Sequence, residues 1–221
     1  MKQSSQISDS IRLGLLLAIS GGFMDAYSYL FRAKVFANAQ TGNLLLLGLS
    51  ILEKEWSNCI KYLVPIMAFM VGVFLATSIH RKLMHQRKYH WRQIAILIEA
   101  IVLFVVAFIP QDLNLFANSL ISLGCGIQIE SFKKIHGLGA STTMCVGNLR
   151  AATSFISDYI YTKNIEDLKK GLLYLLVILF FVIGAIFGSV SIRVLGQASI
   201  LICSILLFFA FIFMFYNNEN N

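Results

Sequence analysis

Two carboxylates stand inside apolar segments at matching places in the two halves of the chain. Asp25 lies within the apolar stretch 11–30, and Glu130 takes the matching place 105 residues later. A charged carboxylate at the centre of a membrane helix costs roughly 2.5 to 3.5 kcal/mol on insertion scales, so it needs a partner, a bound proton or a wet cavity. The pair therefore predicts a proton-carrying or solute-contacting role. The alternative is an interfacial anchor in which Asp25 pairs with Arg32 or Lys34.

A cluster of amides and hydroxyls follows each carboxylate, around the start of the next apolar segment. In hydrocarbon such groups must find partners in the protein or line a cavity. Gly42 and Gly147 let a backbone or a ligand approach closely, or let the helix break so that its amide end faces an anion. The alternative is hydrogen bonding between helices. We predict one substrate-binding site between the halves, formed by Asp25, Asn38, Gln40, Thr41, Asn43, Glu130, Thr142, Thr143, Asn148 and Arg150.

Arg150 breaks the match between the two clusters, because Leu45 takes its place in the first. An arginine beside amides could neutralise a buried carboxylate or bind an anionic solute. The alternative is that its side chain reaches out to the membrane interface. Glu99, in the apolar stretch 94–109, has no match in the other half, and we expect it to face the interior of the bundle.

The similarity between the two halves of the sequence extends over most of the chain. Positions 20–44 align without a gap on 125–149, and a second block aligns at a shift of 112, with Phe69 on Phe181 and Gly72 on Gly184. Duplicated halves with polar centres are typical of membrane transporters. We therefore predict two tandem membrane repeats, 1–110 and 111–221, in one compact membrane domain. The small residues at these places, Gly72 and Gly184 among them, are expected to pack the halves together or to join a homodimer.

Composition indicates an integral membrane protein. The chain is 57% apolar and 13% charged, whereas soluble domains are about 25% charged. A crossing helix needs roughly 20 apolar residues, and the chain holds uninterrupted and polar-interrupted stretches of that order. We predict an all-α bundle of about eight membrane-embedded helices in the tandem repeats. The alternative is six crossings plus two re-entrant helices, which would invert the repeats. The stretches are 63–79, 94–109, 172–192 and 200–216, and then 11–30, 35–52, 115–131 and 140–160.

Basic residues gather between two of these stretches, at 81–92, and the net charge is +7. This is the signature of a cytoplasmic loop that meets anionic lipid heads, rather than of a nucleic-acid surface. Charge counting favours six crossings, whereas the length of 35–52 favours eight. The four cysteines have no C-x-x-C spacing and there is no P-loop, so we expect no metal and no cofactor.

Three runs carry a family resemblance: GGFMDA from residue 21, VFANAQTGNLLLLGL from residue 35, and TTMCVGNL from residue 142. They resemble the YoaK family of uncharacterised bacterial multi-pass membrane proteins. The second copy departs from the first where Val146 replaces Thr41. The resemblance implies a location in the bacterial cytoplasmic (inner) membrane and leaves the biochemistry unassigned.

These features favour a secondary transporter or permease for a small solute over an enzyme. Membrane lipids, the solute and a coupling proton or cation are the expected partners. The main alternative is a non-transporting scaffold or lipid-binding protein, which does not explain duplicated polar groups in apolar segments. An intramembrane enzyme would use Asp25 and Glu130 as paired acids, but the G-x-G-D pattern of membrane aspartyl proteases is missing from GGFMD.

Overall fold

The computed structural model describes residues 11–83, 91–135 and 137–218, so most of the predicted basic loop lies outside it. The described part is all-α and contains no strand beyond an isolated bridge between Ile135 and Leu138. The helices are α1 (Ile11–Phe31), α2 (Gln40–Leu52), α3 (Trp56–Leu83), α4 (Trp91–Val106), α5 (Asn114–Ser131), α6 (Cys145–Thr162), α7 (Ile165–Leu195) and α8 (Ile200–Asn218), with 3-10 turns at η2 (Gln111–Leu113) and η3 (Gly196–Ser199).

Three helical segments of the described chain are long and apolar enough to cross a membrane. They are Ile11–Phe31, Trp56–Lys82 and Ile165–Met214, the last of which joins α7, η3 and α8. The predicted apolar stretch 35–52 becomes helical only at Gln40, because residues up to Ala39 form an irregular segment. The remaining 13 residues of α2 reach about 20 Å at 1.5 Å per residue, less than the roughly 30 Å of a hydrocarbon core.

Close helix contacts join elements that are distant in the sequence. Helix α1 packs along α7, α3 packs along α5, and α4 packs along α8. A Cβ added to Gly22 in α1 would lie 1.9 Å from the carbonyl oxygen of Phe181 in α7. A Cβ added to Gly126 in α5 would lie 2.3 Å from that of Phe69 in α3. Only glycine allows these backbones to approach so closely. Gly72 and Gly184 make further contacts of this kind across the same two helix pairs.

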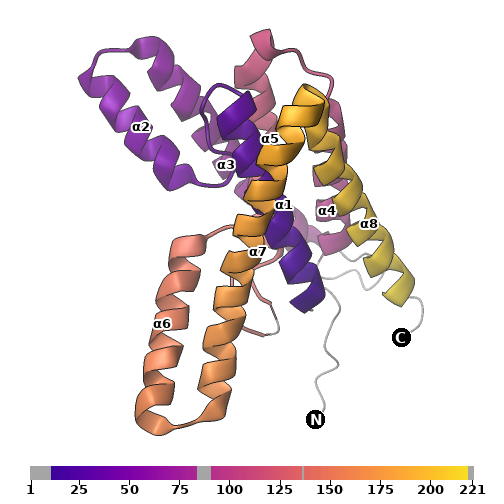
Figure 1. Ribbon diagram of the computed structural model, residues 1–221. Helices are drawn as coiled ribbons and strands as arrows, with labels where there is room; N and C mark the ends of the chain where they lie inside the picture. The colour runs from indigo at the N-terminus through magenta and orange to yellow at the C-terminus, as the bar shows by residue number, and fades with distance from the viewer. Residues whose placement is uncertain (1–10, 84–90, 136, 219–221) are drawn as a thin grey trace.

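Two hairpins extend from this packed centre (Figure 1). Helix α2 turns back on α3, and α6 turns back on α7. Figure 1 shows the α2 and α6 hairpins reaching toward opposite ends of the molecule, whereas α1, α4, α5 and α8 surround the main apolar core. Helices α2 and α6 both begin near the middle of the molecule, where the chain passes through irregular segments at 32–39 and, apart from residue 136, at 132–144.

Candidate functional site

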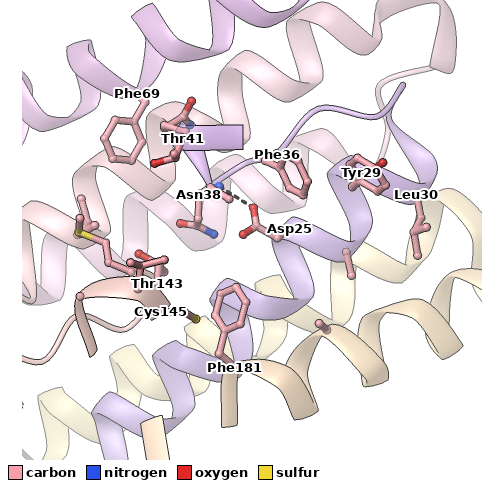
Figure 2. Close-up of a pocket in the computed structure, with 18 of the residues that line it drawn as sticks. Asp25, Tyr29, Leu30, Phe36, Asn38, Thr41, Phe69, Thr143, Cys145 and Phe181 are labelled. Atoms are coloured by element: carbon pink, nitrogen blue, oxygen red, sulfur yellow. Dashed lines mark hydrogen bonds between the residues drawn. The ribbon is translucent and has the colours of Figure 1, made fainter. Parts of the chain in front are cut away.

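A cavity of about 630 Å³ lies where α2 and α6 begin (Figure 2). Its wall is formed by α1, by the irregular segments that precede α2 and α6, by the first turns of those two helices, and by parts of α3, α5 and α7. Five of the predicted site residues line it, namely Asp25, Asn38, Gln40, Thr41 and Thr143. The structure therefore brings together polar residues from both halves of the chain.

Asp25 fastens the segment before α2 onto α1. One carboxylate oxygen accepts the backbone N–H of Asn38 at 2.7 Å, and the Asn38 side-chain nitrogen donates to the carbonyl oxygen of Gly21 at 3.1 Å. Asp25 is only 7% exposed and Asn38 only 8%. The side-chain oxygen of Asn38 has no hydrogen-bond partner among the described residues. In Figure 2 both side chains lie at the cavity, with the ring of Phe181 opposite Asp25.

Asn43 and Asn148 form the same clamp 105 residues apart. The Asn43 side chain accepts the backbone N–H of Phe36 at 2.9 Å and donates to the Phe36 carbonyl oxygen at 2.7 Å. Asn148 does the same with Ser141, at 3.1 Å and 2.6 Å. A side-chain amide that pairs both backbone groups of a residue seven positions earlier replaces a missing backbone ladder. These two predicted site residues support the cavity wall from behind rather than line it.

The segment before α6 carries a second polar arrangement. The Ser141 hydroxyl oxygen accepts the backbone N–H of Met144 at 3.2 Å and of Thr143 at 3.4 Å, which holds the turn just ahead of α6. The Thr143 hydroxyl, only 6% exposed, has no hydrogen-bond partner within the described part of the chain. It matches Asn38 in the first half, and it too lies at the cavity (Figure 2).

Thr142 faces away from the cavity into a network that reaches Glu99. With its amide nitrogen toward the carboxylate, Gln128 donates to the two Glu99 oxygens at 2.7 Å and 2.9 Å and accepts the Thr142 hydroxyl at 3.1 Å. Glu99 is fully buried, as expected from its apolar neighbours. Gln128 is the partner that the sequence did not identify, because a lone glutamine within the apolar segment 115–131 gave no spacing signal.

Glu130 lies outside the cavity. Its carboxylate accepts the hydroxyl of Thr77 at 3.0 Å and pairs with Lys133. The glycine contacts explain this position, because Gly22 and Gly126 are 104 residues apart, one fewer than the shift that aligns Asp25 with Glu130. One residue turns a side chain by about 100° around a helix. At a spacing of 104 the partner of Asp25 is Ile129, which does line the cavity.

Arg150 also lies elsewhere. It is exposed on α6, in a shallow groove that it shares with Thr153, Ser157 and Asp158. Its guanidinium is therefore not placed to neutralise Asp25, and the described residues contain no ion pair between them.

Arg32 is buried completely but does not pair with Asp25. Its guanidinium donates to the carbonyl oxygens of Val106 at 3.0 Å and Pro110 at 3.3 Å, which follow or end α4. The same two oxygens also accept the backbone N–H groups of Ile109 and Leu113, so the arginine adds a second donor to each and ties the end of α1 to the turn after α4. Lys34 lies over an aromatic ring, 4.9 Å from its centroid. The proposed anchor between Asp25 and one of these bases is therefore not formed.

Aromatic side chains, which the sequence analysis did not select, make up much of the wall. Tyr29 and Phe36 stack with ring centroids 4.7 Å apart on one side of Asp25, and Phe69 and Phe181 stand on two other sides. Phe69 and Phe181 occupy matching places in the second aligned block, and this match was the signal that could have identified them. The described residues hold no cluster of three or more metal-ligand side chains.

Comparison with known proteins identifies the family. The model of the family described as "Protein of unknown function (DUF1275)" matches residues 13–213. The chain belongs to the DUF1275 family. It is 30% identical over 185 residues to the UPF0700 transmembrane protein YoaK of Bacillus subtilis (strain 168), a match that covers 80% of this chain and 81% of that protein. No solved structure matches it. The resemblance to the YoaK family is confirmed, and the chain is a membrane protein.

Proposed function

We propose that the protein is a secondary transporter or permease for a small solute, with its binding site in the cavity between the two halves. One observation carries the proposal: α2 and α6 begin at the same cavity, are held there by the same asparagine clamp, and run toward opposite ends of the molecule (Figure 1). Short helices that start at a polar site near the membrane midplane are how many transporters bind their substrates.

The proposed topology has six crossings, made by α1, α3, α4, α5, α7 and α8, with α2 and α6 as re-entrant helices. The shortness of α2 and the opposite directions of the two hairpins support it. An odd number of crossings in each half inverts one half relative to the other, so the tandem repeats 1–110 and 111–221 would be inverted repeats. The positive-inside rule then places the basic stretch 81–92 in the cytoplasm.

In this proposal the protein is a multi-pass component of the bacterial cytoplasmic membrane and catalyses no covalent reaction. Asp25 is the coupling carboxylate, because it is the ionisable acid at the cavity and lies in a crossing helix. Asn38, Gln40, Thr41 and Thr143 contact the solute. Asn43, Asn148 and Thr142 hold the two irregular segments in place.

The direct test is transport by purified protein in liposomes. A metabolite panel is first screened by thermal shift, because a ligand that binds the folded state raises the melting temperature. Each hit is then offered to proteoliposomes with and without an imposed proton gradient, beside protein-free liposomes. We expect at least one hit to accumulate faster with the protein, and faster still with the gradient. Hits that bind but never cross faster than in protein-free liposomes would contradict a transport function and favour a scaffold.

A further inference from the structure

The unsatisfied polar groups at the cavity point to the charge of its ligand. Asn38 uses its side-chain nitrogen on the Gly21 carbonyl, so the atom left without a partner among the described residues is an oxygen, which can only accept. The unpartnered Thr143 hydroxyl can accept as well. Both residues are more than nine-tenths buried and line the cavity. A buried acceptor without a donor is costly, so the ligand is expected to bring the donors.

The start of α2 already faces a negatively charged group of the protein. The amide end of a helix attracts an anion through its free N–H groups and its partial positive charge. Ahead of α2, the Asp25 carboxylate accepts the N–H of Asn38 and supplies a negative charge. Ahead of α6, the Ser141 hydroxyl oxygen accepts the N–H groups of Thr143 and Met144, which precede the first turn of the helix. An anionic ligand near the start of α2 would be repelled by the Asp25 carboxylate.

The charge and the walls of the cavity favour a cation. Among the described lining residues Asp25 is the single carboxylate, and none is a lysine or an arginine. The rings of Phe36, Phe69 and Phe181 stand around it. Aromatic faces attract ammonium groups by about 0.5 to 2 kcal/mol each, depending on solvation. A volume of about 630 Å³ is in the range of small-molecule sites.

We propose that the cavity binds an organic ammonium compound. The ammonium group lies between the Asp25 carboxylate, the Asn38 side-chain oxygen, the Thr143 hydroxyl and the ring of Phe181, and the apolar body of the ligand lies along Phe36 and Phe69. The inference rests on the proposed function, because it names the class of solute for the same site. The ammonium group can belong to a free amine or to the ethanolamine headgroup of a phospholipid, and the experiment separates the two.

The test uses three probes of equal size and different charge: benzylammonium, benzyl alcohol and benzoate. Their binding to purified full-length protein is measured by isothermal titration in a detergent free of aminophospholipids. We expect benzylammonium to bind at least about tenfold more tightly than benzyl alcohol, and benzoate to bind most weakly, since one unshielded charge contact in a buried site contributes on the order of 1.4 kcal/mol. Equal affinity for the three probes, or tighter binding of benzoate, would overturn the proposal.

Variants locate the binding. Asp25→Asn should remove the preference for benzylammonium over benzyl alcohol, and Asp25→Glu should keep it. Phe181→Leu should weaken benzylammonium severalfold more than benzyl alcohol, because only the cation gains from the ring face. Asp158→Asn is the matched control, since this acid lies in the separate α6 groove and its loss should change nothing. An unchanged preference in folded Asp25→Asn protein would overturn the assignment, and the wild-type probe series tests it even if that variant fails to fold.

Two further experiments are needed. The first distinguishes a free amine from a lipid headgroup, and the second distinguishes the proposed ligand class from the proposed transport function. If nanodiscs with phosphatidylethanolamine block benzylammonium binding and nanodiscs with phosphatidylglycerol do not, the headgroup is the source, whereas equal binding in both points to a free amine. Uptake of benzylammonium into proteoliposomes tests transport separately. Binding without uptake would leave the ligand class standing and contradict the transport function. Uptake of benzoate but not of benzylammonium would support the transport function and contradict the ligand class.

Discussion

The α2 and α6 hairpins share a backbone device and differ in the charge that they expose. The start of each helix is fixed by an asparagine that clamps the residue seven positions earlier. Both helices expose apolar side chains, such as Leu45 in α2 and Leu149 in α6, but α6 also exposes Arg150 and Asp158. The elements beside the cavity differ too, because α1 contributes Asp25 and α5 contributes Ile129 at the matching packing position. The comparison teaches that the two halves share the clamp and the close helix contacts but differ in the chemistry that they bring to the cavity.

The largest expected effect concerns the directions of the two hairpins. Glu53 follows α2 and Tyr161 lies near the end of α6, and both side chains are exposed. In a background without native cysteines, we expect Glu53→Cys and Tyr161→Cys to react with a membrane-impermeant maleimide from opposite sides of sealed vesicles. Six crossings require this result, whereas eight crossings place both sites on one side. Labelling of both cysteines from the same side would break the contrast between the hairpins and the inverted topology with it.

The next effect concerns the two carboxylates. Asp25→Asn keeps the shape of the side chain and the acceptor for Asn38, and it removes the charge. We expect this variant to insert and fold normally but to lose nearly all proton- or cation-dependent uptake in proteoliposomes. Glu130→Gln should leave most of the uptake, because that carboxylate faces Thr77 and Lys133 away from the cavity. If the two variants lose uptake equally, the asymmetry between the halves is not functional. If Asp25→Asn fails to insert, the charge of Asp25 is needed for folding rather than for coupling.

The sequence predicted the helical membrane fold and the polar groups, but it did not predict which of them share a cavity. Composition and apolar stretches were enough for the helices, because burial in lipid leaves few other backbone solutions. Asp25 and Thr143 were placed correctly at one cavity because irregular segments bring the starts of α2 and α6 together. Glu130 was wrongly expected at the cavity. The packing contacts of α1 and α5 are equivalent at a shift of 104 residues, whereas the asparagine clamps are equivalent at a shift of 105, and a gapless alignment cannot reveal this difference.

Arg32 and Gln128 show a further limit of sequence reading. Each acts through tertiary partners far along the chain, Arg32 through carbonyl oxygens at the end of α4 and Gln128 through Glu99. Spacing along a helix reports only neighbours three or four positions away. Asp25, seven positions before Arg32, is the nearest acid on the sequence, but the fold places the Arg32 guanidinium at the end of α4 instead.

The helix contacts give the third prediction. Gly22→Ala places a methyl group 1.9 Å from the Phe181 carbonyl oxygen, and Gly126→Ala places one 2.3 Å from that of Phe69. Backbone cannot move aside easily, so we expect each variant to lose about 3 kcal/mol or more of stability, at the upper end of overpacking. Gly48→Ala is the control, because no atom lies within 4 Å of its added methyl group. Melting temperatures in detergent compare the stabilities of the three variants. A loss in only one of the two packed variants would mean that the α1–α7 and α3–α5 contacts are not equally tight.

The smallest effect tests the clamp that the two hairpins share. Asn43→Ala removes both partners of the Phe36 backbone, and Asn148→Ala removes both partners of the Ser141 backbone. Leaving buried backbone groups unpaired costs roughly 1 to 3 kcal/mol, so we expect similar losses of stability in the two variants. Asn58→Ala is the matched control, since that side chain is only partly buried and its one hydrogen bond among the described residues, to Glu55, is exposed. Thermal unfolding in detergent gives the comparison. Equal losses mean that both halves depend on the clamp alike. If Asn43→Ala alone is destabilising, the second hairpin is held by the Ser141 hydroxyl and by Thr142 instead, and the likeness between the two halves does not extend to their energetics.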